Sequence, residues 1–215
     1  VGLGGGLGTG AASVLASTAH ENGALVIALA LMPFECEGHR RFEQARSGLK
    51  QLRETADAVV CLANQHVLEL HGEDKTAQET FEAANILVLQ GAVGIGRLLK
   101  ANGLLTAGLA DLRAVLDGRN SESALAAAEA IGRNRHRALI EQLRTHPFME
   151  KGRVMKEADA LLVSLVGGEE MTMADVNRVM KHINTHCPNA EIVLSAEVDT
   201  SYKGKLGISI ITARG

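Results

Sequence analysis

The sequence predicts an α/β fold in which a parallel sheet is joined by a long central helix to a smaller mixed α/β domain. Three observations support this prediction. Apolar runs of strand length alternate with helical stretches in the first half, as in a parallel sheet covered by helices. Residues 76–101 then keep one uninterrupted helical pattern. The second half holds three more strand candidates, with a helix between the first two.

The elements of the first half follow from the spacing of their apolar residues. After an opening rich in glycine, residues 11–22 favour a short helix that ends at Gly23. The runs 24–31, "ALVIALAL", and 57–63, "DAVVCLA", are continuously apolar, which is typical of strands buried on both faces. Between them, residues 40–56 place apolar side chains at helical spacing. Strand and helix therefore alternate.

The stretch 76–101 contains no proline and predicts one helix, roughly 39 Å long at about 1.5 Å per residue. A helix of this length usually joins two units. We therefore expect one domain over 1–101, with the central helix included, and a second domain over 102–215.

The second half indicates a mixed α/β domain. The strand candidates are 158–168, 190–198 and 206–213. Thr172 is a good N-cap for the helix between the first two, with Asp175 in the capping-box position. The stretch 121–132, "SESALAAAEAIG", is ambiguous. Its alanines favour a helix, whereas a domain of this type is expected to have a strand near this position.

Composition excludes several classes of function. The chain has 215 residues, a formal charge of −3 and only 2% aromatic residues, so nothing favours nucleic acid as a partner. The longest apolar run, 24–34, is too short to span a bilayer, and no secretory signal precedes it. Three widely spaced cysteines suit a reducing cytoplasm.

Two polar clusters are weaker candidates for sites. His182, His186 and Cys187 have the spacing of metal ligands, but no second pair of ligands is evident, so we predict no metal site. Three arginines alternate in "GRNRHRAL", at 133, 135 and 137, and we expect them to lie on a solvated helix face.

The opening stretch "GLGGGLGTG", residues 2–10, has the chemistry of a phosphate cradle. Glycines let backbone N–H groups approach an anion, and the N-terminus of a following helix adds its positive dipole. A tight turn without a ligand is the alternative. No Lys-Ser/Thr follows, so it is not a Walker loop. The dinucleotide spacing fits only in its weaker form, through Gly6, Gly8 and Ala11, and lacks a full preceding strand.

A third interpretation depends on several segments together. "GGGLGTG" resembles the signature GGGTGTG/SG of the tubulin/FtsZ superfamily, and "MPFECEGHRR" is similar to the ribose loop of FtsZ proteins. "LANQ" stands in the place of their I-P-N-D, and "TFEAANILVLQGAVGI" resembles their central helix. "LADLRAVL" and "LGISIITARG" resemble the loop and helix after it and the closing strand. The resemblance runs from Val1 to Gly215 with few gaps.

The resemblance implies a set of nucleotide ligands. Glu37 would bind the ribose, and Arg41 would lie near the phosphates as a forked cation. Leu7 stands where the family usually has threonine, so only its backbone N–H remains as a contact. The implied phosphate contacts are the backbones of Gly5, Gly6, Leu7 and Gly8 and the hydroxyl of Thr9.

The resemblance also implies a guanine pocket. Asn64 and Asn85 match the polar pair that reads the base, and amides suit guanine because they both donate and accept. Phe81 lies one turn before Asn85 and matches the ring that stacks on the base. Without the resemblance, Phe81 would be read as part of an apolar helix stripe.

The implied catalytic loop departs from the family pattern. FtsZ proteins carry N-x-D-x-x-D/E there, and its acids orient the attacking water and help to place the cation. Here Thr106 and Gly108 replace the first two residues, and Asp111 alone remains. We expect GTP and GDP as ligands, Mg²⁺ as cofactor, and slow hydrolysis.

The function implied is that of a GTP-binding cytoskeletal protein of bacterial cell division. Subunits would assemble head to tail into filaments in the cytoplasm, at the division site, with tethering proteins as further partners. The resemblance also implies that the chain corresponds to an FtsZ-like protein without its N-terminal portion and C-terminal tail. Two alternatives stay open: a homologue that assembles without hydrolysis, and a dinucleotide-binding oxidoreductase.

Overall fold

The fold is built on one six-stranded sheet with the strand order β1-β2-β3-β6-β4-β5. The computed structural model describes residues 1–71, 75–99, 103–116, 122–132 and 134–214. Its strands are β1 (Ile27–Met32), β2 (Ala58–Ala63), β3 (Glu122–Ile131), β4 (Ala160–Gly167), β5 (Glu191–Val198) and β6 (Lys205–Arg214). Its helices are α1 (Gly6–Glu21), α2 (His39–Thr55), α3 (Asn64–His71), α4 (Ala77–Leu98), α5 (Leu109–Leu116), α6 (Arg135–Thr145), α7 (Arg153–Lys156) and α8 (Met173–His186). Short 3-10 turns are η1 (Glu35–Glu37), η2 (Pro147–Gly152) and η3 (Thr200–Tyr202).

The sheet has a parallel part and a mixed part. β1 and β2 are parallel, and the first residues of the chain extend this part, because Gly2 bridges to Leu31 in the parallel direction. β3, β6 and β4 are antiparallel neighbours, and β5 runs parallel to β4. Among the described residues, β2 and β3 are paired at one position, Val60 with Ser123. The sheet therefore forks between β2 and β3.

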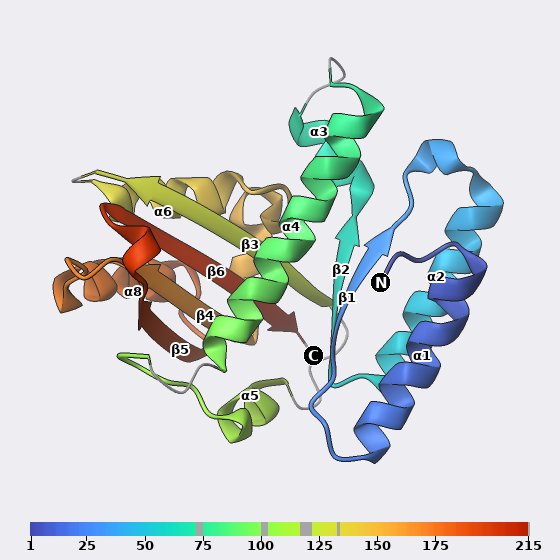
Figure 1. The fold of residues 1–215 in the computed structure, drawn as a ribbon, viewed down its shortest axis with the longest axis horizontal. Helices are drawn as coiled ribbons and strands as arrows, with labels where there is room; N and C mark the ends of the chain where they lie inside the picture. Colours follow the sequence, from blue (N-terminus) through green and yellow to red (C-terminus); the bar gives the residue numbers. More distant parts are fainter. Residues whose placement is uncertain (72–74, 100–102, 117–121, 133, 215) are drawn as a thin grey trace.

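Helices cover both faces of the sheet. In Figure 1, α1 and α2 lie beside β1 and β2, α4 crosses in front of the strands, and α6 and α8 lie on the far side. Leu52 of α2 and Val59 belong to one buried cluster, whereas Leu98 of α4 and Val60 belong to another. A third cluster packs Leu139 of α6 and other side chains of α6 and α8 on the alanines of β3. Neighbouring residues of each buried strand thus face opposite layers.

Most predicted elements are confirmed, including the Thr172 cap. The Thr172 hydroxyl accepts a hydrogen bond from the Asp175 backbone at 3.2 Å, and the Asp175 carboxylate accepts from Thr172 N at 3.1 Å. The central helix is described over Ala77–Leu98, 22 residues and about 33 Å; the end predicted at 101 lies outside the described residues. Among the described residues no helix is long and apolar enough to cross a membrane.

The ambiguous stretch 121–132 is a strand over Glu122–Ile131. It pairs with β6 along its whole length, from Glu122 to Ile131. Ala126, Ala128 and Ala130 are buried in the cluster with α6. Ten paired residues outweigh a helix preference of a few tenths of a kcal/mol per residue.

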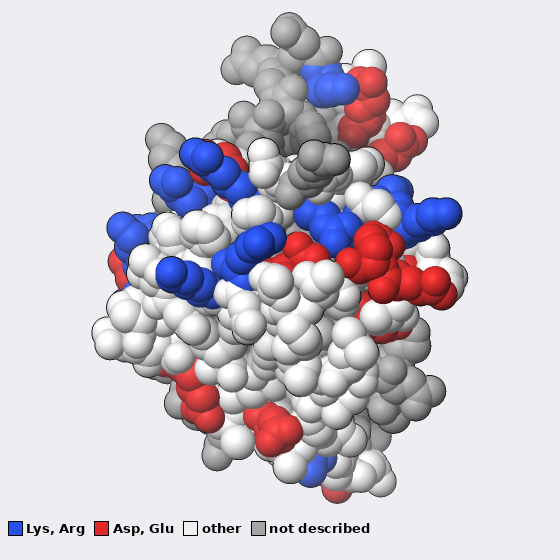
Figure 2. All heavy atoms as spheres, turned by 90° about the vertical axis from the view of Figure 1, so that its left-hand side faces the viewer, with Lys and Arg blue, Asp and Glu red and all other residues white. Residues whose placement is uncertain are grey.

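One side of the molecule carries charge of both signs. Figure 2 shows the side that is on the left in Figure 1, with basic and acidic side chains interleaved across its upper half. Its lower half is largely uncharged. This face therefore presents no continuous surface of one sign.

His146, at the end of α6, makes the fold sensitive to acid. Burial lowers its pKa to about 4, and neither ring nitrogen has a hydrogen-bond partner among the described residues. The unfolded chain, with an ordinary histidine pKa of about 6.5, binds a proton that the folded chain does not, so stability falls as the pH drops below about 6.5. We expect a loss of about 2 kcal/mol between pH 7 and pH 5. Urea unfolding at several pH values should show that the free energy of unfolding depends less steeply on pH in His146→Leu than in the parent. His182→Leu, at an exposed position, should keep the parent slope.

Candidate functional site

The candidate site lies at the edge of the sheet where β1 and β2 end, which is the upper end of these two strands in Figure 1. Residues 1–3, β1 and β2 run parallel, so the loops that follow them reach this same edge. These loops hold the glycine-rich stretch, the segment 33–37 and Asn64. Parallel topology thus gathers candidates that are far apart in the sequence.

The glycine-rich stretch is partly helical. α1 begins at Gly6 with Gly5 as N-cap, which corrects the prediction that the helix begins at residue 11. The backbone N–H of Thr9 is bonded to the carbonyl of Gly5 at 3.1 Å. The first four N–H groups of a helix have no partner within it, and here they belong to the stretch Gly5–Gly8. These are the N–H groups expected to bind phosphate, at a positive helix end.

Two glycines of this loop are required by its shape. Gly4 has φ +96°, a left-handed conformation that favours glycine. A Cβ on Gly8 would lie 2.1 Å from the carbonyl oxygen of Gly2, which is backbone and cannot move aside. The loop therefore depends on these glycines for its own fold, besides any contact with a ligand.

The side chains of Leu7 and Thr9 differ in their surroundings. Leu7 is 86% exposed, so it can offer only its backbone. The Thr9 hydroxyl is buried and accepts a hydrogen bond from Gly4 N at 2.9 Å. The structure thus gives Thr9 a role in shaping the loop. A hydroxyl that accepts can still donate, so a contact of Thr9 with phosphate stays a prediction.

Glu37 and Arg41 are paired with each other. Arg41 Nη1 lies 2.8 Å from Glu37 Oε2, and the other carboxylate oxygen accepts from Phe34 N at 2.8 Å. Backbone of Arg41 also packs on the loop, because a Cβ on Gly4 would lie 2.9 Å from its carbonyl oxygen. The carboxylate predicted for ribose and the cation predicted for phosphate are thus adjacent to each other, beside the glycine loop.

Phe34 is a site residue that the sequence did not single out. Its ring meets Phe81 edge to face, with centroids 5.1 Å apart and an interplanar angle of 79°. Phe34 is buried, whereas Phe81 is 49% exposed and can offer a ring face to a ligand. The signal was available, since Phe34 is an aromatic residue directly after a buried strand, in the "MPFECEG" motif.

The two asparagines differ in exposure. Asn64 begins α3 and is 7% exposed, and its Oδ1 has no hydrogen-bond partner among the described residues. A buried amide oxygen without a donor costs about 1–3 kcal/mol, and the N1–H and N2–H groups of guanine are suitable donors. Asn85 is exposed on α4, one turn after Phe81. The Asn64 oxygen is therefore an acceptor of the kind that a guanine base would satisfy, and the guanine pocket stays a prediction.

Asp111, in the first turn of α5, lies at the other end of the molecule. Asp111 Oδ2 accepts from Gly108 N at 2.8 Å, and Leu105 bridges to Ala196 of β5. In α5, Arg113 donates to the carbonyl of Gly23, just past the C-terminal end of α1. α1 has 16 residues and a length of about 24 Å, and the glycine loop is at its opposite end. Asp111 and the glycine loop therefore do not meet within one chain.

Among the described residues, His182, His186 and Cys187 have no further metal ligand beside them. In the described part of the chain no group of three or more His, Cys, Asp or Glu residues is placed to hold a metal ion. Cys187 is buried, which raises its pKa to about 11 and disfavours the thiolate that binds metals. His186 Nδ1 lies 2.8 Å from the backbone carbonyl of His182.

Comparison with known proteins gives one family. The Tubulin/FtsZ family GTPase domain matches residues 1–72, and the FtsZ family C-terminal domain matches residues 122–214. Cell division protein FtsZ 2 of Rhizobium meliloti (strain 1021) is 33% identical over 211 residues, which is 98% of this chain and 60% of that protein. Cell division protein FtsZ of Aquifex aeolicus (strain VF5) is 31% identical over 98% of this chain and 57% of its own length.

A solved structure agrees with these matches. The empty FtsZ dimer of M. jannaschii superposes with a TM-score of 0.89 at 25% identity, over 99% of this chain and 61% of that one. The chain thus spans about 60% of the length of these relatives. Two family models in the expected order, FtsZ relatives along nearly the whole chain and the same fold establish that the chain belongs to the tubulin/FtsZ superfamily and is FtsZ-like.

Proposed function

We propose that this chain is the GTP-binding subunit of a filament that assembles head to tail. The observation that supports this proposal is the separation of the two candidate half-sites. The glycine loop is at one end of α1, and α5 contacts the other end. An acid from one subunit reaches a nucleotide only when a second subunit is stacked on the first. One solved relative is described as an FtsZ dimer, and another, CetZ2 of Haloferax volcanii, as a GTPγS-bound protofilament.

Binding of the nucleotide would use the groups gathered at the sheet edge. Backbone N–H groups of Gly5–Gly8 would donate to the phosphates, with Arg41 beside them. Glu37 would accept from the ribose hydroxyls, and Phe81 would stack on the base. Mg²⁺ held by the phosphates would neutralise part of their charge, and few protein ligands are needed because Mg²⁺ is commonly bound by phosphates and one or two carboxylates.

We also propose that the chain forms two domains, over residues 1–101 and 102–215. This division is supported by the sheet, in which the described residues of β2 and β3 share one residue pair whereas those of β3 and β6 share ten. The relatives matched are named cell division proteins. We propose that the filament acts at the division site, in the cytoplasm, with tethering proteins as partners.

The base pocket is expected to prefer guanine to adenine. Asn85→Leu removes an amide that guanine would satisfy, so we expect the preference for GDP over ADP to fall about tenfold, from a penalty of about 1–3 kcal/mol per unpaired group. Titration of the whole natural protein with both nucleotides measures this. Asn177→Leu, at an exposed position on α8, is the matched control and should keep the preference. Equal affinities for GDP and ADP in the parent would contradict the pocket.

Hydrolysis is expected to be slow and to depend on Asp111 of the neighbouring subunit. Positioning of the nucleophile is most of what a protein supplies to phosphoryl transfer, and each ~1.4 kcal/mol lost there costs about tenfold in rate. Asp111→Ala should lower phosphate release further, while Gly108→Asp should raise it by restoring a second acid. The new Cβ would lie 3.2 Å from Asp111 Oδ2, a contact that the exposed Asp111 side chain can relieve by rotation.

A mixing experiment tests the shared site directly. Asp111→Ala subunits keep the glycine loop, and Asn85→Leu subunits keep Asp111. An equimolar mixture should release phosphate faster than either variant alone, because one of the two kinds of mixed junction joins the intact nucleotide site of an Asp111→Ala subunit to the intact acid of an Asn85→Leu subunit. A phosphate-release rate of the mixture equal to the mean of the two separate rates would refute a shared site. Assembly with GTP but no phosphate release from the parent would favour the homologue that does not hydrolyse, as Gly108 and Thr106 already suggest.

A further inference from the structure

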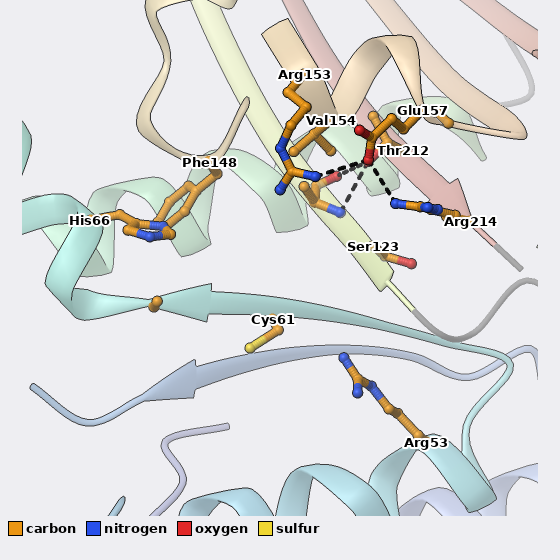
Figure 3. Close-up of a pocket in the computed structure, with 13 residues that line it drawn as sticks. Arg53, Cys61, His66, Ser123, Phe148, Arg153, Val154, Glu157, Thr212 and Arg214 are labelled. Carbon is orange, nitrogen blue, oxygen red and sulfur yellow. Dashed lines mark hydrogen bonds and ion pairs between the residues drawn. The ribbon is translucent and has the colours of Figure 1, made fainter. Parts of the chain in front are cut away.

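A cavity lies where the sheet forks, and its lining adjoins Asn64 of the candidate nucleotide site in the chain, since it includes Ala63 and His66. Its volume is about 240 Å³, the liquid volume of roughly eight waters. It is lined by residues of α2, β2, α3, β3, η2, α7 and β6, so both sides of the fork contribute to it. Figure 3 shows these side chains around the space between β2 and the strands β3 and β6.

The polar lining of this cavity is rich in cationic donors. Arg53 enters from α2, and Arg153 and Arg214 enter from α7 and β6 on the other side (Figure 3). Both Arg153 and Arg214 bind Glu157, at 2.9 Å and 2.7 Å, and Glu157 is the one carboxylate among the described lining residues. Each guanidinium carries five N–H donors, so an arginine that is paired within the protein still has donors for a ligand.

The remaining lining is apolar or holds a buried hydroxyl. Phe148 and Val154 form part of the wall, and Phe148 is 5% exposed. Ser123 is 6% exposed, and its hydroxyl has no hydrogen-bond partner among the described residues. An apolar wall with a few polar groups is the usual lining of a small-molecule site.

We propose that this cavity binds a small organic anion, with an apolar body against Phe148 and a carboxylate or phosphate held by the arginines. The rim arginines are half exposed, with 53% and 44% of the Arg153 and Arg214 side chains accessible, so the anion enters from solvent. Arg53 meets it from the opposite side of the fork. The bound anion therefore links the β1-β2 part of the sheet to the β3-β6-β4-β5 part.

The binding test is carried out without nucleotide. Benzoate and phenyl phosphate are the probes for the two anion chemistries, and benzamide is the neutral analogue of the first. At constant ionic strength, benzoate should raise the melting temperature of the protein in a saturable way, and benzamide should not. A larger shift with phenyl phosphate would assign the site to phosphate esters, and a larger shift with benzoate would assign it to carboxylates.

Variants separate this cavity from other anion sites. Arg53→Gln should weaken binding about tenfold or more, because a hydrogen bond to a charged group is lost. Ser123→Ala should weaken it about threefold. Arg137→Gln, at an exposed position of α6 outside the cavity, is the control and should bind as the parent does. Each shift is measured against the same variant without probe, so altered stability does not obscure the result.

The nucleotide site is the main competing explanation. Arg41→Gln alters that site and should leave the benzoate response unchanged. A response that is lost in Arg41→Gln and kept in Arg53→Gln would overturn the proposal and assign the anion to the glycine loop. No saturable response to either anion in the parent would also overturn it.

Discussion

Replacing Gly94 by valine is expected to lower the free energy of unfolding by about 3 kcal/mol, because α4 lies too close to β6 for any side chain there. A Cβ at this position would lie 2.5 Å from the Cβ and 2.7 Å from the Oγ of Ser209. The Oγ could rotate away, but the Cβ is attached directly to the backbone of β6, so the helix itself would have to move. α4 also carries Phe81 and Asn85, so nucleotide affinity should fall with stability.

Gly96 provides the matched control on the same helix. A Cβ there has no heavy atom within 4 Å, and the residue is exposed. Gly96→Val should change stability by a few tenths of a kcal/mol, since valine and glycine differ little in helix propensity. Urea unfolding of both variants gives the comparison. Equal midpoints for Gly94→Val and Gly96→Val would refute the close packing of α4 on the sheet.

Replacing Arg135 by alanine is expected to cost about 3 kcal/mol, since it removes one partner of a buried ion pair. Arg135 is 8% exposed and reaches Asp175 Oδ2 at 3.0 Å and Glu170 Oε1 at 3.1 Å. Glu170 in turn accepts from Gly204 N at 2.8 Å, so this arginine holds the start of α6, the start of α8 and the turn before β6 together. Arg135→Lys should recover only part of the loss, because an ammonium cannot fork to both acids.

The loss of unfolding free energy caused by Arg135→Ala should depend on pH. Burial opposes ionisation of Asp175, but hydrogen bonds from Thr172 and Arg135 outweigh it and hold the pKa of this carboxyl below its usual value. The stabilisation is therefore present above the ordinary aspartate pKa of about 3.9 and is lost as the pH falls through the lower folded value. The difference in free energy of unfolding between parent and Arg135→Ala should be largest at pH 7 and should shrink as the pH falls below about 3.9. Arg137→Ala, at an exposed position of the same helix, should be near neutral over this pH range.

The sequence did not predict this ion pair. Arginines at alternate positions indicated a solvated helix face, and for Arg135 that was wrong; Arg133 lies outside the described residues. The acids that pair with Arg135, Glu170 and Asp175, lie 35 and 40 residues further along the chain. A local pattern carries no information about such distant partners.

The candidate site was predictable to the extent that it follows from local chemistry. The glycine loop, the amides, Phe81 and the lone Asp111 could each be named from motifs. Their relations could not be. The pairing of Glu37 with Arg41 and the contact of Phe34 with Phe81 depend on how loops meet at the sheet edge.

The sequence by itself determined the order and type of most elements, because apolar periodicity and caps act over a few residues. It determined the parallel start of the sheet, the long helix α4 and the cap at Thr172. Only the tertiary structure decided that the alanine-rich stretch 122–131 is a strand, because its pairing with β6 outweighs its helix propensity. It also decided that Asp111 lies at the opposite end of α1 from the glycine loop, since helix length and packing, not sequence distance, set that separation.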